Sequence, residues 1–274
     1  MKKGTLSIGI GSFLLVVILL MVLSAPLLTA HDPIHVESRL RFLPMSGSNL
    51  MGTDNFGRDI FSRVLYGGRI TLSLSFLAMV VTGMLGMIVG ILSALYHGKA
   101  FDVLCMRTVD VLLAMPFLVV AMAITTFLGR GLDKLLIVVV LMGWASFARL
   151  ARSLTLALKS NPSLVAARVL GASTTTLVLR EILPRILFPM VINITLELSG
   201  IILSLSTLSF FGMGNKPPNP EWGSMLSDGR LYMTQAPNML IWPCVFIFLT
   251  VLGLNLLGEG LRDYANPFEM IPLE

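Results

Sequence analysis

The sequence predicts an all-α membrane protein with six transmembrane helices. Its 274 residues are 55% hydrophobic and only 13% charged, whereas soluble domains are about 45–50% apolar and about 25% charged. The mean hydropathy is +0.85. The chain also contains six apolar segments of roughly 20 residues, the length that a helix needs to cross a bilayer. The net charge of +5 is modest, and no other feature points to a nucleic-acid partner.

The six predicted spans lie at 6–28, 70–95, 109–129, 132–150, 186–211 and 239–257. Lys2 and Lys3 precede the first span, a pattern that is also typical of a secretory signal peptide. The apolar run is too long for a signal peptide and no clear cleavage pattern follows it, so we expect a retained anchor span. We divide the chain into this anchor with an extracytoplasmic segment, 1–69, and a five-span core, 70–274.

An even number of spans places both termini on the same side of the membrane. The connection between the fourth and fifth spans, from Arg149 to Arg185, holds six basic residues and one acid, Glu181. Loops rich in Lys and Arg tend to remain in the cytoplasm. We therefore expect this connection and both termini to be cytoplasmic.

The segment 51–69, MGTDNFGRDIFSRVLYGGR, predicts an amphipathic helix in the outer membrane interface. Five apolar residues share one helical face: Phe56, Ile60, Phe61, Val64 and Leu65. Two acid–base pairs have the i,i+4 spacing of helical ion pairs: Asp54–Arg58 and Asp59–Arg63. Thr53 or Asp54 can cap the start of this helix, and Gly67-Gly68 can end it.

The stretch 160–185, SNPSLVAARVLGASTTTLVLREILPR, interrupts the apolar sequence between the fourth and fifth spans. Asn161 can cap a helix whose first residue is Pro162, where the missing N–H does no harm. Gly171 suits the end of this helix, and Ser173 can cap a second short helix. The first helix carries apolar side chains at three exposed positions: Val165, Val169 and Leu170. We expect a helix–glycine–helix corner whose apolar face docks into a partner.

This stretch resembles the EAA loop of ATP-binding cassette (ABC) importer permeases. The matching residues are Ala166, Ala167, Gly171, Ile182, Leu183 and Pro184, whereas Val165 stands where the family has Glu. Further stretches, in order, are similar to the second permease subunit of dipeptide, oligopeptide and nickel importers: MGTDNFGRDIFSRVLYGGRITLSLS (51–75), MRTVDVLLAMP (106–116), GWASFARLARS (143–153), LSFFGMG (208–214) and PEWGSMLSDGR (220–230). Five separated motifs make the resemblance specific.

The resemblance implies a type I ABC importer permease fold with a cytoplasmic coupling helix in the loop 151–185. It implies a bacterial inner-membrane complex with a homologous permease subunit, two cytoplasmic ATPase subunits and an extracytoplasmic substrate-binding protein. The residues that would couple to the ATPase are Leu164, Val165, Ala166, Ala167, Arg168, Leu170, Gly171, Ala172 and Ser173. ATP and Mg would bind to the ATPase subunits, so we expect no cofactor, metal site or catalytic residue in this chain.

The sequence contains no G-x-x-x-x-G-K-[ST] phosphate-binding motif, which agrees with an energy supply from a partner. A stand-alone secondary transporter or channel is the alternative, although paired interrupted spans in two halves are not evident. A membrane enzyme is a third class. The predicted spans contain no His, and His31, His35 and His97 cannot be combined with a Ser into a catalytic constellation.

Glu197 lies in the middle of the fifth span, four residues after Asn193 and so on the same helical face. A carboxylate at the bilayer centre costs about 2.5–3.5 kcal/mol on insertion scales, so such residues usually face a protein interior or a water-filled path. We expect Asn193 and Glu197 either to line the translocation pathway or to bond to the partner permease. The sequence favours neither alternative.

Other polar residues near the spans have local explanations. His31, Asp32 and His35 are close enough in sequence for a metal site, but a proline-directed turn is the favoured interpretation. Arg107 and Asp110 are three residues apart, so we expect a local ion pair between them.

The two cysteines and two of the prolines also lead to predictions. The spacing of Cys105 and Cys244 does not fit a metal site, and both are expected to be buried free thiols. Pro116 and Pro189 are expected to break or bend their spans, either as parts of a gate or as packing kinks.

The substrate is the property that the sequence determines least. The resembling family carries short peptides, nickel and metal–chelator complexes. The stretch before the first span is short, as in the nickel-type members, and Glu197 would suit a cation. We therefore expect a metal ion or metal complex slightly ahead of a peptide.

Overall fold

The computed structural model describes residues 3–215 and 217–265. In this part of the chain the regular structure is helical, apart from a single β-bridge between Thr53 and Asp59. Five helices are long and apolar enough to cross a membrane, and a bent pair of helices provides a sixth span if it is counted as one. The predicted all-α fold is confirmed.

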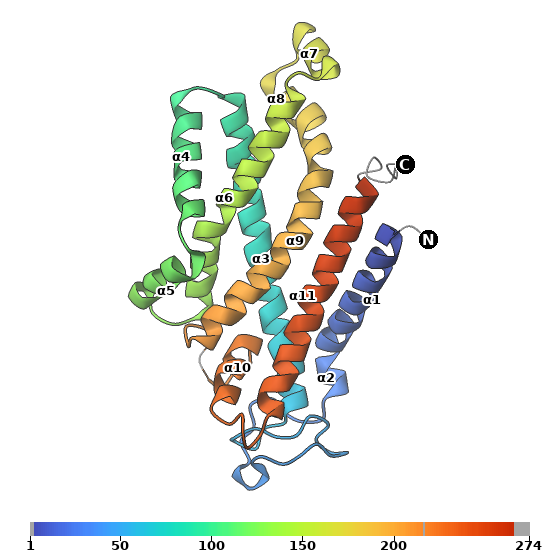
Figure 1. Cartoon of the computed structure of the whole chain (residues 1–274), viewed down its shortest axis with the longest axis vertical. Helices are drawn as coiled ribbons and strands as arrows, with labels where there is room; N and C mark the ends of the chain where they lie inside the picture. The colour runs from blue at the N-terminus through green and yellow to red at the C-terminus, as the bar shows by residue number, and fades with distance from the viewer. Residues whose placement is uncertain (1–2, 216, 266–274) are drawn as a thin grey trace, which may run out of the picture.

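Five long helices form the bundle: α1 (Lys3–Leu23), α3 (Ile60–Leu95), α6 (Leu132–Leu158), α9 (Leu183–Phe210) and α11 (Asn238–Ala265). Helix α3 packs most extensively on α6 and also contacts α9, while α1 packs on α11 (Figure 1). The start of α1 and the end of α11 point toward the end of the molecule that carries α7 (Pro162–Val169). The described ends of the chain therefore share one side of the bundle.

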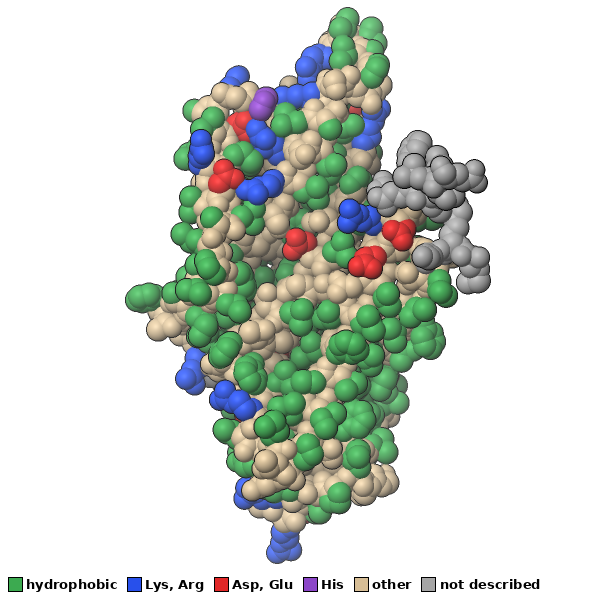
Figure 2. Space-filling model, in the orientation of Figure 1, with side chains coloured by type: hydrophobic (Ala, Val, Ile, Leu, Met, Phe, Trp, Pro, Cys, Tyr) green, Lys and Arg blue, Asp and Glu red, His purple; other side chains and the backbone are tan. Residues whose placement is uncertain are grey.

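The remaining helices are short: α2 (Ala25–Leu28), η1 (Ser38–Leu40), α4 (Ala100–Ala114), α5 (Phe117–Leu128), α8 (Thr174–Thr176), η2 (Leu177–Ile182) and α10 (Trp222–Arg230). The loop between α2 and α3 and the helix α10 cover the end of the bundle opposite α7 (Figure 1). Hydrophobic side chains cover most of the middle of the molecule, and charged side chains gather near the α7 end (Figure 2). This distribution fits a bundle that spans a bilayer.

Glycines allow α1 and α11 to approach backbone to backbone. Gly4 faces Gly260, and Gly11 faces Gly253; a Cβ at residue 11 would lie 2.7 Å from the carbonyl oxygen of Gly253. The glycines of each helix are seven residues apart, so they lie on one side, two turns apart. Small residues at such contacts let helices pack closely in lipid, where burial of apolar surface gives little driving force.

The third span is broken. Helices α4 and α5 meet at 95°, and Pro116 between them has no N–H to continue the helix. Met115 is extended, with φ −83° and ψ 134°, as the residue before a proline prefers. The predicted break at Pro116 is confirmed. The span begins at Ala100 rather than near residue 109, and α9 continues through Pro189 without interruption.

The prediction of an interfacial amphipathic helix over 51–69 is wrong. The chain turns before α3, which starts at Ile60 with Asp59 as its side-chain cap. Helix α3 then runs without interruption past Gly68, and this glycine leaves room for the fully buried indole of Trp222 from α10. The indole N–H of Trp222 donates to a carbonyl of α3 at 2.8 Å. Ile60, Val64 and Leu65 of the predicted apolar face are therefore covered by protein, whereas Phe56 is 46% exposed.

Candidate functional site

Helix α7 has the caps that its sequence predicts at both ends. Asn161 Oδ1 accepts a hydrogen bond from the Ser163 N–H at 3.0 Å, and Pro162 occupies the first helical position. At the other end Gly171 has a φ of +85°, a conformation that favours glycine. Its N–H and that of the next residue donate to carbonyls of the last turn, which is a Schellman ending. The corner is therefore defined by local bonds.

The surface of α7 divides into a buried anchor and an exposed apolar side. Leu164, one of the predicted coupling residues, is 1% exposed and packs in a cluster with Ile91, Leu177, Ile182 and Ile186. Val165, Val169 and Leu170 are 46%, 80% and 86% exposed. The other predicted coupling residues are exposed (Ala166, Arg168, Gly171, Ser173) or half-buried (Ala167, Ala172). Leu164 thus holds α7 in place while its neighbours face outward.

The second half of the loop is not a separate helix, contrary to the prediction. Helices α8, η2 and α9 follow one another without a gap from Thr174 to Phe210, and Ser173 Oγ accepts from the Thr176 N–H at 3.2 Å. In the π-helical turn η2 the Leu183 N–H bonds five residues back, just before Pro184, which has no N–H. A displacement of the corner would therefore act directly on the fifth span.

Arg185 of α9 fastens the start of α7. Its guanidinium donates to Ser163 Oγ at 2.8 Å and to Glu181 Oε2 at 2.7 Å. The Ser163 contact bridges the corner, so α7 and the beginning of α9 are connected by a polar bond as well as by the Leu164 cluster, whereas the Glu181 contact lies within one continuous helix.

Asp102 of α4 is a buried carboxylate that joins three helices near α7. It accepts hydrogen bonds from Arg152 of α6, with Nε to Oδ1 at 2.7 Å, and from Ser93 of α3. The Gly98 N–H donates to Oδ2 at 3.0 Å, and His97 Nδ1 lies 3.0 Å from the same oxygen. Sequence reasoning missed this cluster. The available signal was an acid shortly before the predicted span 109–129 and an arginine just after the predicted span 132–150.

The predicted Arg107–Asp110 pair is wrong. Asp110 pairs with Arg149 of α6 at 2.6 Å, because α4 packs beside α6 and presents its acids to the arginines of that helix. The two cysteines are free; Cys105 is partly buried, but Cys244 is exposed, so the expectation of burial is wrong for Cys244.

Glu197 lines a cavity of about 330 Å³ between α4, α5, α6 and α9. Met115 and Phe117, on either side of the break in the third span, contribute to its wall, as do Ser146 and Ser204. Among the described residues, the Glu197 carboxylate has no hydrogen-bond or ion-pair partner. Asn193 is half-buried on the same face of α9 but is not part of the cavity wall.

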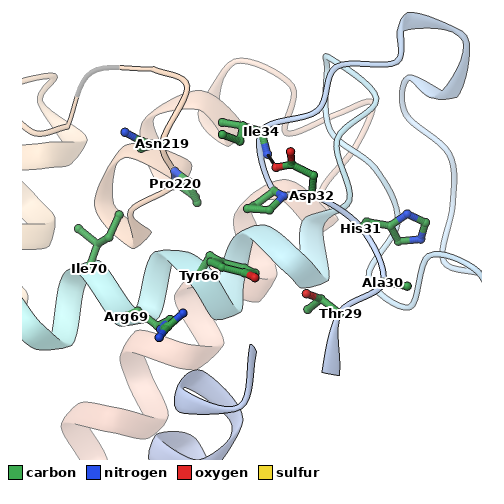
Figure 3. A pocket seen from close by; sticks show the side chains of 11 residues that line it. Thr29, Ala30, His31, Asp32, Ile34, Tyr66, Arg69, Ile70, Asn219 and Pro220 are labelled. Carbon is green, nitrogen blue, oxygen red and sulfur yellow. Dashed lines mark hydrogen bonds between the residues drawn. The ribbon is translucent and has the colours of Figure 1, made fainter. Parts of the chain in front are cut away.

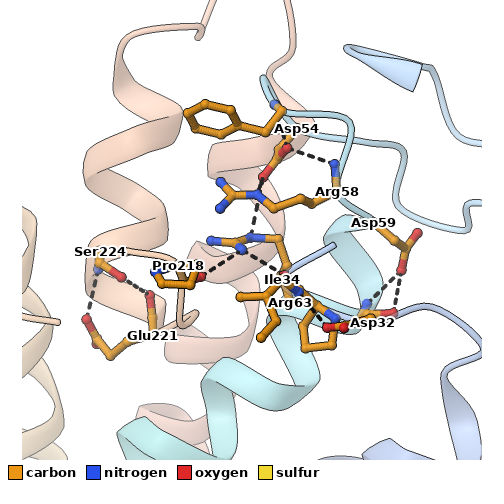
Figure 4. Close-up of polar contacts among 12 residues, drawn as sticks. Asp32, Ile34, Asp54, Arg58, Asp59, Arg63, Pro218, Glu221 and Ser224 are labelled. Carbon is orange, nitrogen blue, oxygen red and sulfur yellow. Dashed lines mark hydrogen bonds and ion pairs between the residues drawn. The ribbon is translucent and has the colours of Figure 1, made fainter. Parts of the chain in front are cut away.

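At the opposite end of the bundle, Arg63 of α3 ties two loops together (Figure 4). Its guanidinium donates to the carbonyls of Pro33 at 2.9 Å and Pro218 at 3.3 Å. Its Nε lies 3.4 Å from Asp54 Oδ2, and the side chain is buried. Arg58 Nε also donates to Asp54, at 2.7 Å, which confirms the predicted Asp54–Arg58 pair.

The predicted Asp59–Arg63 pair is wrong because each residue has another role. Asp59 Oδ2 accepts from the Ser62 N–H at 2.7 Å and caps α3, while Arg63 turns to Asp54 and the loop carbonyls. An N-terminal cap places a carboxylate next to the free N–H groups of the first turn, where it is favourable.

Two acids near α10 have raised pKa values. Glu221 accepts from the N–H groups of Gly223 and Ser224 at 2.8 and 2.9 Å and caps α10 (Figure 4). Burial raises the pKa of Glu221, and these hydrogen bonds partly oppose the rise. Burial also raises the pKa of Asp228, opposed by the positive charges of Arg63 and Arg58.

A pocket of about 650 Å³ opens beside these loops and is lined by residues of the α2–α3 loop, α3 and the loop before α10 (Figure 3). His31 lies 3.1 Å from the Ser48 carbonyl, and Asp32 accepts from the Ile34 N–H at 2.9 Å. The predicted turn at this position is confirmed. In residues 3–215 and 217–265 no group of three or more His, Cys, Asp or Glu could hold a metal ion.

Known proteins are similar to this chain over most of its length. Residues 86–268 match the family described as binding-protein-dependent transport system inner membrane component. The chain is 38% identical over 261 residues to a putative peptide transport system permease protein of Brucella suis, covering 95% of this chain and 88% of that protein. It is 36% identical over 267 residues to a dipeptide transport system permease protein of Alkalihalophilus pseudofirmus, with 97% and 87% covered. A glutathione transport system permease protein of Escherichia coli is 43% identical over 216 residues, with 79% and 71% covered.

Proposed function

The chain belongs to the binding-protein-dependent transport system inner membrane components, and from this premise we propose that it forms half of the pathway by which an ATP-driven importer takes up short peptides. The family membership confirms the resemblance predicted from the sequence. The protein is thus a permease component of an ABC importer.

The names of the relatives support peptides as the substrate. They refer to peptides, to dipeptides and to glutathione, which is itself a tripeptide. The sequence alone slightly favoured nickel or a metal complex, in part because Glu197 would suit a cation. A peptide also carries a cationic group at its amino terminus, so this carboxylate is equally compatible with a peptide.

The exposed apolar side of α7 is the observation that carries the coupling proposal. Val169 and Leu170 are 80% and 86% exposed on a corner that is capped at both ends and anchored by Leu164. Exposed apolar side chains on an ordered helix are typical of a surface that docks into a groove. We assign this surface to the ATPase subunit. ATP-driven closure would displace the corner, and the uninterrupted helix from Thr174 would carry the movement into the membrane.

The partners follow from the same arrangement. Two ATPase subunits would contact the α7 end of the complex, which would be the cytoplasmic end together with both termini. A homologous permease would complete the pathway, and a substrate-binding protein would deliver the peptide at the α10 end. The excess of basic residues between Arg149 and Arg185 supports this orientation. Asn193 and Glu197 on α9 would face the pathway.

Reconstitution tests the function. The chain, its companion permease, the ATPase subunits and the binding protein are placed in proteoliposomes, and uptake of a labelled dipeptide is measured. We expect uptake only with ATP, with the ATPase and with the binding protein. A stand-alone secondary transporter or channel would instead move the peptide when this chain is present alone, and that result would overturn the proposal. Uptake of nickel but not of any peptide would overturn the substrate assignment.

A further inference from the structure

We propose that the cavity around Glu197 binds the protonated amino group of a peptide as it crosses the membrane. The inference rests on the proposed function and extends it, because it assigns a binding site between α4, α5, α6 and α9 and the part of the substrate that this site recognises.

The Glu197 carboxylate has no hydrogen-bond or ion-pair partner among the described residues, although it lies in the middle of a membrane-spanning helix. It lies at the middle of the 28-residue helix α9 and is half-buried. No described residue donates a hydrogen bond to it, and no Lys, Arg or His lies in the cavity wall. Ionisable groups at this depth are costly unless they meet an opposite charge or water. The site therefore fits a cation that is supplied from outside the chain.

The remaining wall suits an amino group attached to an apolar body. The hydroxyl groups of Ser146 and Ser204 line the same cavity as Glu197, so a carboxylate and two neutral oxygens are available to an ammonium group, which has three donors. The rest of the wall is mainly apolar, with Leu113, Phe117 and Met142 among its members. These side chains can contact the side chain of a peptide residue.

The small number of oxygen ligands in the cavity wall argues against a divalent metal ion. Calcium takes six to eight oxygen ligands, and magnesium requires a near-octahedral set. The wall offers one carboxylate and two hydroxyls, with no His or Cys. An ammonium group is satisfied by three acceptors, so it matches the number of polar groups present.

The volume and position of the cavity fit a transported group. At about 330 Å³ it lies at the lower end of the range of about 300–1,000 Å³ for small-molecule pockets. It adjoins the non-helical junction between α4 and α5 at Pro116. Irregular backbone at membrane depth is tolerated where it lines a cavity or is buried in protein.

Cysteine labelling tests the charge of the site without relying on the binding protein. In the assembled transporter, Cys105→Ser and Cys244→Ser provide the background, and Ser204→Cys or Ser146→Cys places a thiol in the cavity wall. The labelling rates of this chain are measured with cationic aminoethyl and anionic sulfonatoethyl methanethiosulfonate. We expect the cation to be preferred, and Glu197→Gln to reduce the preference by about tenfold.

Peptide protection tests the ligand on the same thiols. Glycyl-leucine should slow labelling by a neutral methanethiosulfonate, N-acetylglycyl-leucine should protect less, and Glu197→Gln should abolish the difference. Three results would each overturn the inference. The thiols could remain unlabelled, the charge preference could be unchanged in Glu197→Gln, or the two peptides could protect equally. An unchanged preference would also indicate that a partner cation already occupies the carboxylate.

The two proposals fail in different ways. If Glu197→Gln changes neither labelling nor protection while the reconstituted transporter still takes up dipeptides, the proposed function stands and the amino-group site is wrong. If the transporter takes up no peptide, the proposed function is itself overturned.

Discussion

Arg152 of α6 donates two hydrogen bonds to the carboxylate of Asp102 of α4, one from Nε to Oδ1 at 2.7 Å and one from a terminal nitrogen to Oδ2 at 2.9 Å. The Asp102 side chain is only 4% exposed and also accepts from Ser93 of α3. One carboxylate thus fixes three helices to one another just before α6 leads into α7. This bond therefore fixes the part of α6 that leads into the corner.

Removing the guanidinium should destabilise the bundle. In Arg152→Gln, Asp102 stays buried but loses its charged donor, a loss of about 1.5–3 kcal/mol for a hydrogen bond to a charged group. The matched control is Arg149→Gln on the same helix, whose pair with Asp110 is more than half exposed on both sides and should contribute at most about 1 kcal/mol. Thermal unfolding in detergent checks both variants, and equal midpoints would contradict the prediction.

The glycine corner should be needed for coupling. Gly171→Val places a β-branched residue at φ +85°, where an L-residue is strained by roughly 1–2 kcal/mol, so the corner should distort. We expect ATP hydrolysis to continue while peptide uptake falls at least about tenfold. Gly212→Val introduces the same strain at φ +83° near the α10 end and serves as the control. Full coupling in Gly171→Val would show that the corner does not transmit the movement.

The apolar side of α7 should determine ATPase binding. Leu170→Asp places a charge on the proposed contact surface, and copurification of the ATPase subunits should be lost. Leu231→Asp, at a residue that is 71% exposed next to α10, should leave copurification intact. Val165→Glu restores the family residue, and we expect no more than a small gain because packing dominates the contact. A large gain would show that this charge is required.

The close glycine contact between α1 and α11 should not tolerate a larger side chain at residue 11. In Gly11→Leu the Cβ would lie 2.7 Å from both the Gly253 carbonyl and the Leu257 amide, so the helices must separate at a cost of about 1–3 kcal/mol. Gly9→Leu is the matched control, since no atom lies within 4 Å of a Cβ there. Limited proteolysis of α1 should accelerate in Gly11→Leu alone. Equal cleavage of the two variants would contradict the prediction that α1 and α11 must pack closely at Gly11.

The α10 end should become more stable on mild acidification. Burial raises the pKa of Asp228 above its ordinary value of 3.8, so the folded state binds the proton more tightly than the unfolded state. The penalty for the charged form is present above the raised pKa and disappears as the pH falls toward 3.8.

A pH series of unfolding midpoints checks this prediction. The wild type should gain stability as the pH is lowered toward 3.8, the ordinary pKa of an aspartate, and Asp228→Asn should give a flatter profile. Glu221, whose pKa is raised in the same direction, should retain part of the slope. A profile for Asp228→Asn that is as steep as the wild-type profile would show that Asp228 is not the titrating group.

The corner could be predicted because its signals are adjacent in sequence. Asn161 and Pro162 start α7, Gly171 ends it and Ser173 starts the next helix, and every one of these bonds joins residues a few positions apart. The sequence did not reveal that the next helix continues into the fifth span. The π-helical turn before Pro184 replaces the missing bond and removes the expected gap.

The outer segment could not be predicted because its partners come from the far end of the chain. Ile60, Val64 and Leu65 share a face, as expected, but they pack in one cluster with Trp222 and Phe246 rather than against lipid. An amphipathic pattern reports that one face is covered and does not identify what covers it.

Glu197 illustrates the same limit at the candidate site. Its position in an apolar span was visible in the sequence, and the cost of burying a carboxylate indicated that it faces either a pathway or another protein chain. The cavity depends on the packing of α4, α5, α6 and α9 and on the angle at Pro116, which no local pattern encodes. For the same reason the pairing of Asp102 with Arg152 emerged only from the folded chain.

The contact of α1 with α11 also constrains how the protein is made. Helix α1 is synthesised first and its partner α11 last. The face of α1 that carries Gly4 and Gly11 therefore has no α11 to pack against during most of translation. Bundle closure is therefore a late step of biogenesis. A nascent chain that stops before residue 238 lacks α11 and therefore leaves this glycine face without its partner helix.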